Sequence, residues 1–268
     1  MAERDRWRVK PGADVDLKGI DPGSTEGCPS REQATATFED LSARLGNLQE
    51  RLWAEHTRSL LVVLQAIDAG GKDGTIKHVF RGLDPAGARV VSFRAPSEGE
   101  LDHDFLWRVH QRTPGKGEVV VFNRSHYEDV LVVRVHGYVP EEVWRPRYKH
   151  IQHFEENLVA AGTTVVKLFL HISGEEQAKR FQARIEDPTK RWKFKKADLE
   201  ERAYWGDYQV AFQEAIARTS TGAAPWYVVP ADHKWYRNWA VSTILLETLE
   251  ELDPRYPLGD DIDGVVIV

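Results

Sequence analysis

A continuous apolar run, SLLVVLQAID at residues 59–68, leads directly into the glycine-rich segment AGGKDG at residues 69–74. The run has too few residues for a typical helix and no polar–apolar alternation, a pattern typical of a strand that is buried on both faces. Such strands occur in parallel sheets that helices cover from both sides. This junction therefore favours an α/β fold with a ligand loop after its first strand.

The rest of the sequence alternates between strand-like and helix-like patterns, which predicts one mostly parallel sheet with helices on both faces. Further strands are expected at residues 89–93, 118–122, 163–172 and 226–229. Helices are expected at residues 30–56, 73–82, 140–161, 174–185, 198–218 and 234–252. With no internal repeat or low-complexity linker, we expect one domain at residues 31–253. Residues 1–30 are expected to form an extended arm that either wraps the domain or stays loose. Residues 254–268 are expected to form an acidic tail.

The bulk composition excludes several classes of protein. Of the 268 residues, 41% are hydrophobic, which is enough for a core and argues against general disorder. No apolar run approaches the roughly 20 residues of a membrane helix, and the N-terminus MAERDRWRVK lacks the apolar stretch of a secretory signal. The single cysteine, Cys28, forms no internal disulfide. We therefore expect a cytoplasmic protein without a membrane partner.

The first strand–helix junction has the context of a phosphate-binding loop. Glycines let backbone N–H groups approach phosphate oxygens, a helix N-terminus adds partial positive charge, and a lysine here reaches the outer phosphates. The pattern G-x-x-x-x-G-K-[ST] is broken twice, by Ala66 and by Asp73. A tight turn with a solvated Lys72 is therefore the alternative. Two carboxylates, Asp68 and Asp73, flank the lysine and suggest Mg²⁺, which prefers oxygen ligands.

A second junction brings more polar side chains to the same edge of the sheet. The strand VVVF at residues 119–122 is followed by NRSHYED at residues 123–129. Arg124 is suited to bind phosphate bidentately, and Glu128 offers a carboxylate. Asn123 stands where such enzymes usually have an acidic metal ligand. The alternative is an Arg–Glu ion pair that caps a helix.

A basic segment lies between two expected helices. Residues 184–196 carry six basic and two acidic residues, a local charge of +4 in a chain whose net charge is -6. Pro188 breaks the preceding helix, and Trp192 lies among the cations, as in a lid over an anionic ligand. We expect Asp198 and Glu201 to form a capping box for the next helix. A solvated charged face is the alternative.

The acidity of the chain belongs to its C-terminal end. Residues 247–268 carry seven acidic residues and one basic residue, a sum of -6, so the remaining residues have 35 charges of each sign. The net charge therefore does not exclude a polyanionic ligand.

Three ordered motifs resemble the polyphosphate kinase 2 family. They are DAGGKDGTIK at residues 68–77, FNRSHYED at residues 122–129 and DPTKRWK at residues 187–193. The resemblance covers residues 35–250 and implies an α/β P-loop kinase fold, similar to thymidylate kinase, with a basic lid at residues 184–200. It also implies phosphoryl transfer between inorganic polyphosphate and a nucleotide (AMP, ADP or ATP), with Mg²⁺ or else Mn²⁺ as cofactor, in a homo-oligomer (dimer or tetramer). The residues at positions 73, 123 and 128 resemble the class III subgroup, which phosphorylates both AMP and ADP.

The resemblance also assigns roles to residues at the matching positions. The expected catalytic residues are Asp68, Lys72, Arg124 and Glu128, and the expected metal ligands are Asp68 and Asn123. The expected phosphate and polyphosphate contacts are Ala69, Gly70, Gly71, Asp73, Gly74, Thr75, Lys77, Lys190, Arg191 and Lys193.

Three other functions remain open at this stage. They are a nucleotide monophosphate kinase that uses ATP, a non-catalytic regulator that binds polyphosphate or nucleotide, and, as the weakest, a nucleic-acid-binding protein, for which no recognised module is present.

Overall fold

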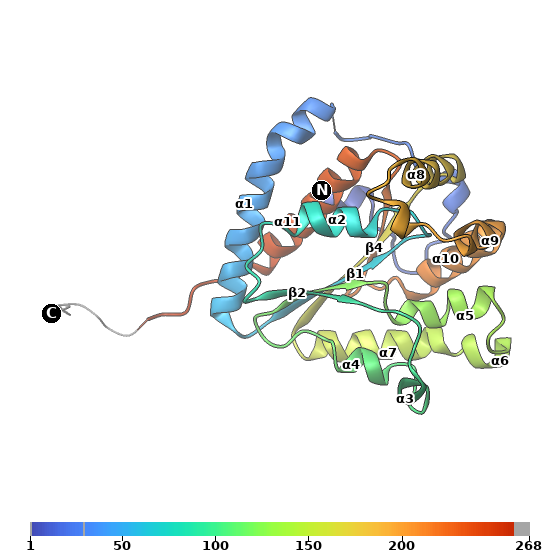
Figure 1. The fold of residues 1–268 in the computed structure, drawn as a ribbon. Helices are drawn as coiled ribbons and strands as arrows, with labels where there is room; N and C mark the ends of the chain where they lie inside the picture. Colours follow the sequence, from blue (N-terminus) through green and yellow to red (C-terminus); the bar gives the residue numbers. More distant parts are fainter. Residues whose placement is uncertain (1, 29, 260–268) are drawn as a thin grey trace, which may run out of the picture.

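A parallel five-stranded sheet forms the centre of the computed structural model, which describes residues 2–28 and 30–259 (Figure 1). The strand order is β2-β3-β1-β4-β5, and all four pairings are parallel. The strands are β1 (Ser59–Gln65), β2 (Ala88–Ser92), β3 (Val119–Asn123), β4 (Thr163–His171) and β5 (Trp226–Pro230). The expected parallel sheet is confirmed, and β1, which leads into the glycine-rich loop, is its central strand.

Helices cover both faces of the sheet, as Figure 1 shows, with α1, α2 and α11 on one side and α4 and α7 on the other. The longer helices are α1 (Arg31–Glu55), α2 (Lys72–Val79), α7 (Arg147–Ala160), α8 (Gly174–Glu186), α9 (Ala197–Ala203), α10 (Trp205–Thr219) and α11 (Lys234–Leu252). The short helices are α3 (Glu98–Leu101), α4 (Trp107–His110), α5 (Val132–Val135) and α6 (Glu141–Trp144). The 3-10 turns are η1 (Glu3–Arg6), η2 (Leu17–Gly19), η3 (His126–Asp129) and η4 (Arg191–Lys193). In the described residues, no helix has the length and apolar character needed to span a membrane.

The central strand contributes to two separate cores, because successive side chains of a strand point to opposite faces. Leu60, Val62 and Leu64 pack with α1 and α11, whereas Leu61 and Val63 pack with α7 and α10. All five are at most 1% exposed. Their burial on both faces explains why the sequence shows an uninterrupted apolar run here.

Two long helices expected from the sequence are each divided in the structure. The expected helix at residues 140–161 is α6 followed by α7, because Pro146 has no N–H to donate to the carbonyl of Glu142. The expected helix at residues 198–218 is α9 followed by α10, with Tyr204 between them at φ -85° and ψ 12°. Periodicity carries through both breaks, so it did not reveal them.

The expected capping box at the start of the second of these helices is wrong. Helix α9 begins at Ala197, and the carboxylate of Asp198 accepts a hydrogen bond from the N–H of Lys195. The carboxylate of Glu201 instead contacts the ring of His136, with Nε2 to Oε1 at 2.7 Å. Glu201 therefore does not cap the helix, and its carboxylate pairs with His136.

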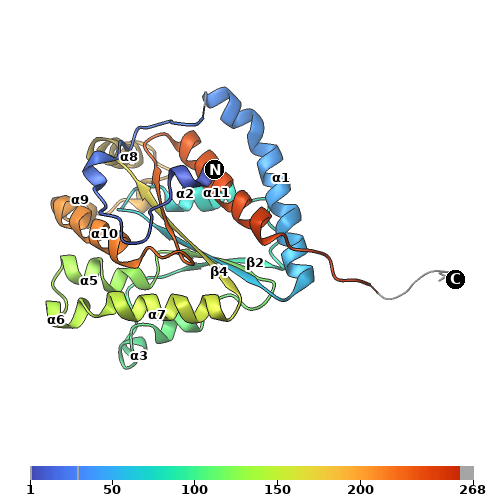
Figure 2. The ribbon, with the colours of Figure 1, turned by 180° about the vertical axis from the view of Figure 1, so that it is seen from behind.

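The N-terminal arm wraps the domain. The N–H of Val9 donates to the carbonyl of Trp226 and the N–H of Val228 donates to the carbonyl of Trp7, both at 2.9 Å, so the arm pairs with the outer edge of β5. Pairing of this kind protects an edge strand. Figure 2 shows the first part of the arm in dark blue near α11, which η1 contacts, whereas Val15 and Leu17 pack in the core with α7 and α10. Of the expected acidic tail, residues 260–268 lie outside the described residues.

Candidate active site

The loop between β1 and α2 has a backbone that depends on its glycines. Gly71 has a positive φ angle of 105°, a region that glycine adopts without steric cost, and Ala69 adopts a positive φ of 62° although it carries a Cβ. A Cβ at Gly70 would lie 2.4 Å from the Cβ of Ala66 and 2.7 Å from the carbonyl oxygen of Ile67. The loop closes onto the helix where the N–H of Thr75 donates to the carbonyl of Gly71 at 2.9 Å. The result is a tight strand-to-helix loop with backbone N–H groups at a helix N-terminus, which suits an anion.

Lys72 is the first residue of α2, and its side chain turns back under the loop. It is 9% exposed, and Nζ donates to the carbonyl of Ala66 at 2.7 Å. Burial, and then the charge of Arg124, lowers the pKa of Lys72 to about 8. The lysine is thus a desolvated cation beside the loop, not the solvated side chain of the alternative interpretation.

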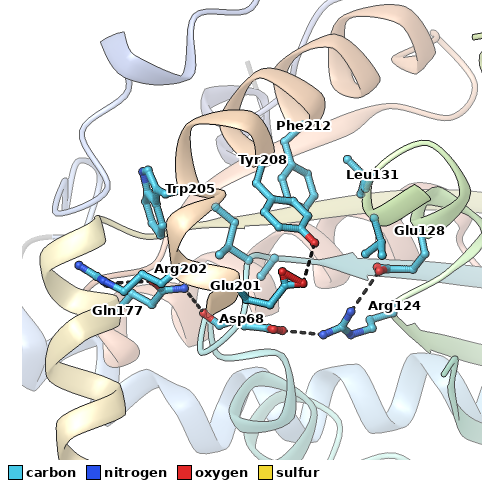
Figure 3. A pocket seen from close by; sticks show the side chains of 13 residues that line it. Asp68, Arg124, Glu128, Leu131, Gln177, Glu201, Arg202, Trp205, Tyr208 and Phe212 are labelled. Carbon is cyan, nitrogen blue, oxygen red and sulfur yellow. Dashed lines mark hydrogen bonds and ion pairs between the residues drawn. The ribbon is translucent and has the colours of Figure 1, made fainter. Parts of the chain in front are cut away.

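Arg124 joins the two strand–helix junctions. It follows β3 with a positive φ of 61°, and its guanidinium donates to Asp68 at 2.5 Å and to Glu128 at 3.1 Å (Figure 3). The charge of Glu128 raises the pKa of Arg124 above its already high value. The side chains of Asp68 and Arg124 are each about a third exposed. Arg124 is therefore held in a fixed position while it keeps access to a ligand.

Asp68, Arg124 and Glu128 form one side of a pocket with a cavity volume of about 150 Å³. Figure 3 shows α10 on the opposite side, with the aromatic rings of Trp205, Tyr208 and Phe212. The other lining residues are Ala66, Ile67, Leu131, Val132, Gln177, Glu201 and Arg202. Charged groups that include Arg124, together with the aromatic rings of α10, suit a ligand that has both a phosphate and a flat ring.

Sequence reasoning did not identify the side of the pocket formed by α9 and α10. Glu201, Trp205, Tyr208 and Phe212 are spaced by four, three and four residues, so they share one face of this helical segment. The hydroxyl of Tyr208 donates to Glu201 at 3.4 Å. The spacing was the available signal, but an aromatic stripe with this period is also typical of a helix that packs on the core.

The structure places the remaining predicted phosphate contacts on α2 and in the basic lid. Near the loop, the side-chain amide of Asn123 donates to Asp73 at 3.1 Å, and Lys193 of the lid lies 3.6 Å from the other oxygen of Asp73. Within the lid, Lys190 pairs with Asp187 at 2.5 Å, and Arg191 donates to the carbonyl of Ile185. The lid therefore contacts the first turn of α2 through Lys193.

Besides Asp73, three of the predicted contacts belong to α2, the helix that follows the loop. Gly74 and the buried Thr75 lie in the first turn of α2, where the Thr75 hydroxyl donates to the carbonyl of Gly71 at 3.2 Å. Lys77 is exposed on α2 and forms no ion pair with the described residues. The structure thus does not bring Lys77 into the pocket.

The predicted metal ligands have different partners in the structure. Asp68 contacts Arg124, whereas Asn123 contacts Asp73. Within residues 2–28 and 30–259, no three His, Cys, Asp or Glu side chains form a metal cluster. Mg²⁺ is commonly held by one or two carboxylates together with phosphate oxygens of a substrate. The partly exposed carboxylate of Asp68 fits that kind of site.

The sheet is parallel and has a Gly-Gly-Lys loop after its central strand, and carboxylates hold an arginine at the end of the neighbouring strand. These features define a kinase-type phosphotransferase with a P-loop kinase-like fold. Residues 29–257 match the family model described as Polyphosphate kinase 2. The chain belongs to this family.

Two relatives align with almost the whole length of the chain. It is 53% identical to the AMP/ADP-polyphosphate phosphotransferase of Meiothermus ruber, over 98% of this chain and 99% of the relative. It is 43% identical to the ADP-polyphosphate phosphotransferase of Rhodopseudomonas palustris, over 94% and 91%. The crystal structure of Polyphosphate Kinase 2 from Arthrobacter aurescens TC1 superposes with a TM-score of 0.93 at 44% identity, over 97% of this chain and 93% of that one.

Proposed function

We propose that this enzyme transfers phosphoryl groups between inorganic polyphosphate and nucleotides, and so forms ADP from AMP and ATP from ADP. The observation that carries the proposal is Arg124, which Asp68 and Glu128 hold at the mouth of the pocket next to the loop of Lys72. The name of the Meiothermus ruber relative supports both nucleotide acceptors. It also favours this function over the ATP-dependent kinase and the non-catalytic regulator.

The two sides of the site serve different parts of the reaction. The loop, Lys72 and the basic lid bind the polyphosphate donor, and the pocket between Asp68 and the aromatic residues of α10 binds the nucleotide. Phosphoryl transfer needs in-line placement and neutralisation of the phosphate oxygens more than covalent chemistry. Lys72 and Arg124 provide fixed positive charge at the point of transfer, and no covalent protein intermediate is required.

We also propose that the enzyme uses Mg²⁺ or Mn²⁺. Asp68 would hold the ion together with phosphate oxygens, and Asn123 would contribute its neutral amide oxygen. When bound, the ion would neutralise phosphate charge and so assist positioning. Asp68 itself keeps Arg124 in place in either case.

A direct assay tests the proposed function. Purified protein, Mg²⁺, ADP and long-chain polyphosphate are mixed without a nucleoside triphosphate, and ATP formation is measured. We expect ATP from ADP, and ADP followed by ATP from AMP. Transfer that requires ATP as donor would instead indicate a nucleotide monophosphate kinase, and binding without turnover would indicate a regulator.

Changing Glu128 to Asn is expected to impair AMP more than ADP as acceptor, by about tenfold in the ratio of kcat/KM values. The change removes a carboxylate partner of Arg124, and AMP has no β-phosphate to help fix its position. Parallel assays with AMP and ADP measure the ratio. Equal losses with both acceptors would contradict a role for Glu128 in acceptor choice.

The activity should depend on the protonation of Lys72. The pKa of Lys72 is about 8, so the lysine is cationic below this pH and loses its charge above it. We expect kcat/KM for polyphosphate to fall as the pH rises from 7.5 to 9.5. The kcat should fall less, because the bound polyanion stabilises the cation and raises its pKa. Profiles at constant ionic strength check this, and a kcat/KM that stays constant to pH 9.5 would refute it.

The assembly and location of the enzyme are also proposals. We propose a cytoplasmic homo-oligomer, either a dimer or a tetramer. Light scattering after size-exclusion chromatography measures the mass against the 30.6 kDa of one chain.

A further inference from the structure

A buried cation without a carboxylate partner among the described residues lies close to the phosphate-binding loop. Arg237, on the first turns of α11, is 2% exposed. Its Nε and Nη2 donate to the side-chain oxygen of the adjacent Asn238, at 3.2 and 2.8 Å. Among residues 2–28 and 30–259, no acidic side chain forms an ion pair with it, and its Nη1 donates no hydrogen bond. A buried guanidinium in this state is costly, because it has lost water without gaining an opposite charge.

The guanidinium lies directly against the loop. A Cβ at Gly71 would be 2.1 Å from Nη1 of Arg237, and a Cβ at Gly74 would be 3.3 Å from Nη2. Figures 1 and 2 both show α11 beside α2, and the two helices are in contact. Arg237 therefore faces the N-terminal turn of α2, where the partial charge of the helix is also positive. An anion between them would stabilise both the guanidinium of Arg237 and the N-terminus of α2.

A second cation from α8 reinforces the positive charge. Arg180 is 9% exposed and donates to the loop carbonyl of Ala69 at 3.0 Å. Its carboxylate partner is Glu176, at 2.8 Å. Burial, and then the charge of Arg180, lowers the pKa of Arg237 to about 9. The two arginines thus repel each other across Gly71, and Glu176 balances Arg180 alone.

We propose that Arg237 is a binding residue for the polyphosphate donor and contacts a phosphate that follows the transferred one along the chain. The proposal rests on the proposed function, which places the donor on the loop. The donor extends from Lys72 across Gly71 to Arg237, with Arg180 beside it. Arg237 contacts the donor and not the nucleotide, because it does not line the pocket.

Calorimetric titration with tripolyphosphate, in the absence of nucleotide, tests this proposal. Changing Arg237 to Gln should weaken binding by about 10- to 100-fold, because the phosphate would no longer receive a charge-assisted hydrogen bond at a buried site. Changing Arg237 to Lys should weaken binding less, because the charge remains. The matched control is Arg44→Gln, which removes an arginine that pairs with Glu250 near the far end of α11. The control should bind like the wild type.

Thermal unfolding separates a binding role from a structural one. In the described part of the chain, the side chain of Arg237 donates hydrogen bonds only to Asn238, and its charge is uncompensated. Without ligand, Arg237→Gln should therefore unfold at the same temperature as the wild type or higher. Tripolyphosphate should raise that temperature much less in the variant than in the wild type. A lowered unfolding temperature without ligand would show that Arg237 supports the fold, and would overturn the proposal.

The remaining outcomes distinguish this inference from the proposed function. Equal binding by wild type and Arg237→Gln would overturn the inference and leave the proposed function intact. Wild-type binding that disappears in Arg237→Gln, without any transfer to ADP or AMP, would support the inference and refute the proposed function. No tripolyphosphate binding by the wild type would overturn both.

Discussion

Changing Lys72 to Ala is expected to lower kcat/KM for polyphosphate-dependent ATP formation by about 10³-fold or more. Lys72 is the buried cation beside the loop between β1 and α2, which we propose binds phosphate, and its Nζ lies 2.7 Å from the carbonyl of Ala66 at the base of this loop. A charge at a desolvated position stabilises developing phosphate charge more strongly than one in water. Steady-state assays with saturating ADP measure the decrease.

An exposed lysine provides the control for this change. Lys116 lies before β3, at the amino end of the strand and so at the edge of the sheet opposite the site. Lys116→Ala should change kcat/KM by less than about twofold, as is usual for a surface substitution. Turnover by Lys72→Ala within tenfold of the wild type would show that the site is wrongly assigned.

Changing Lys167 to Met is expected to lower the free energy of unfolding by about 3–5 kcal/mol. Lys167 lies on β4 and is fully buried, and its Nζ donates to Glu155 and to the carbonyl of Thr219, both at 2.6 Å. Methionine has a similar length but cannot neutralise the carboxylate. Glu155, which is 1% exposed, would then be left as an uncompensated buried charge.

A double variant separates the effect of removing the pair from the effect of an unpaired charge. Lys167→Met combined with Glu155→Leu replaces the pair by apolar groups, and should be more stable than Lys167→Met alone. Urea unfolding followed by fluorescence and by circular dichroism measures both. A double variant no more stable than the single one would mean that the cost does not come from the unpaired carboxylate.

The buried Lys167–Glu155 pair also helps to hold the turn that carries Glu128. The hydroxyl of Tyr127 donates to Glu155 at 2.8 Å, and Tyr127 lies in the turn between Arg124 and Glu128. The pair is formed by residues of α7 and β4, and it fixes a turn that follows β3. Lys167→Met should therefore also reduce activity at temperatures where the variant remains folded.

Local patterns were sufficient to predict most of the fold. Helices α1 and α11 begin and end within one residue of the expected bounds, because apolar residues recur along them at steps of three and four. The buried strand β1 was predicted from its continuous apolar run, and the loop that ends at Lys72 from its glycines and lysine, so both depended on residues that are neighbours in the sequence. The two broken helices were missed because periodicity continues through Pro146 and Tyr204.

By itself, the sequence determined a mostly parallel α/β sheet, a glycine-rich loop after a strand that is buried on both faces, and a second polar junction that carries Arg124. The tertiary structure decided which distant side chains meet these motifs. It places Glu201 and Tyr208 on the opposite side of the pocket, Lys193 against Asp73, and Arg237 over Gly71. Arg237 and Gly71 are separated by more than 160 residues, and the period of a helix or strand carries no information about contacts over such a distance. The physical reason is that backbone geometry sets the local period, whereas the packing of α8, α10 and α11 around the sheet sets where charges from different segments converge.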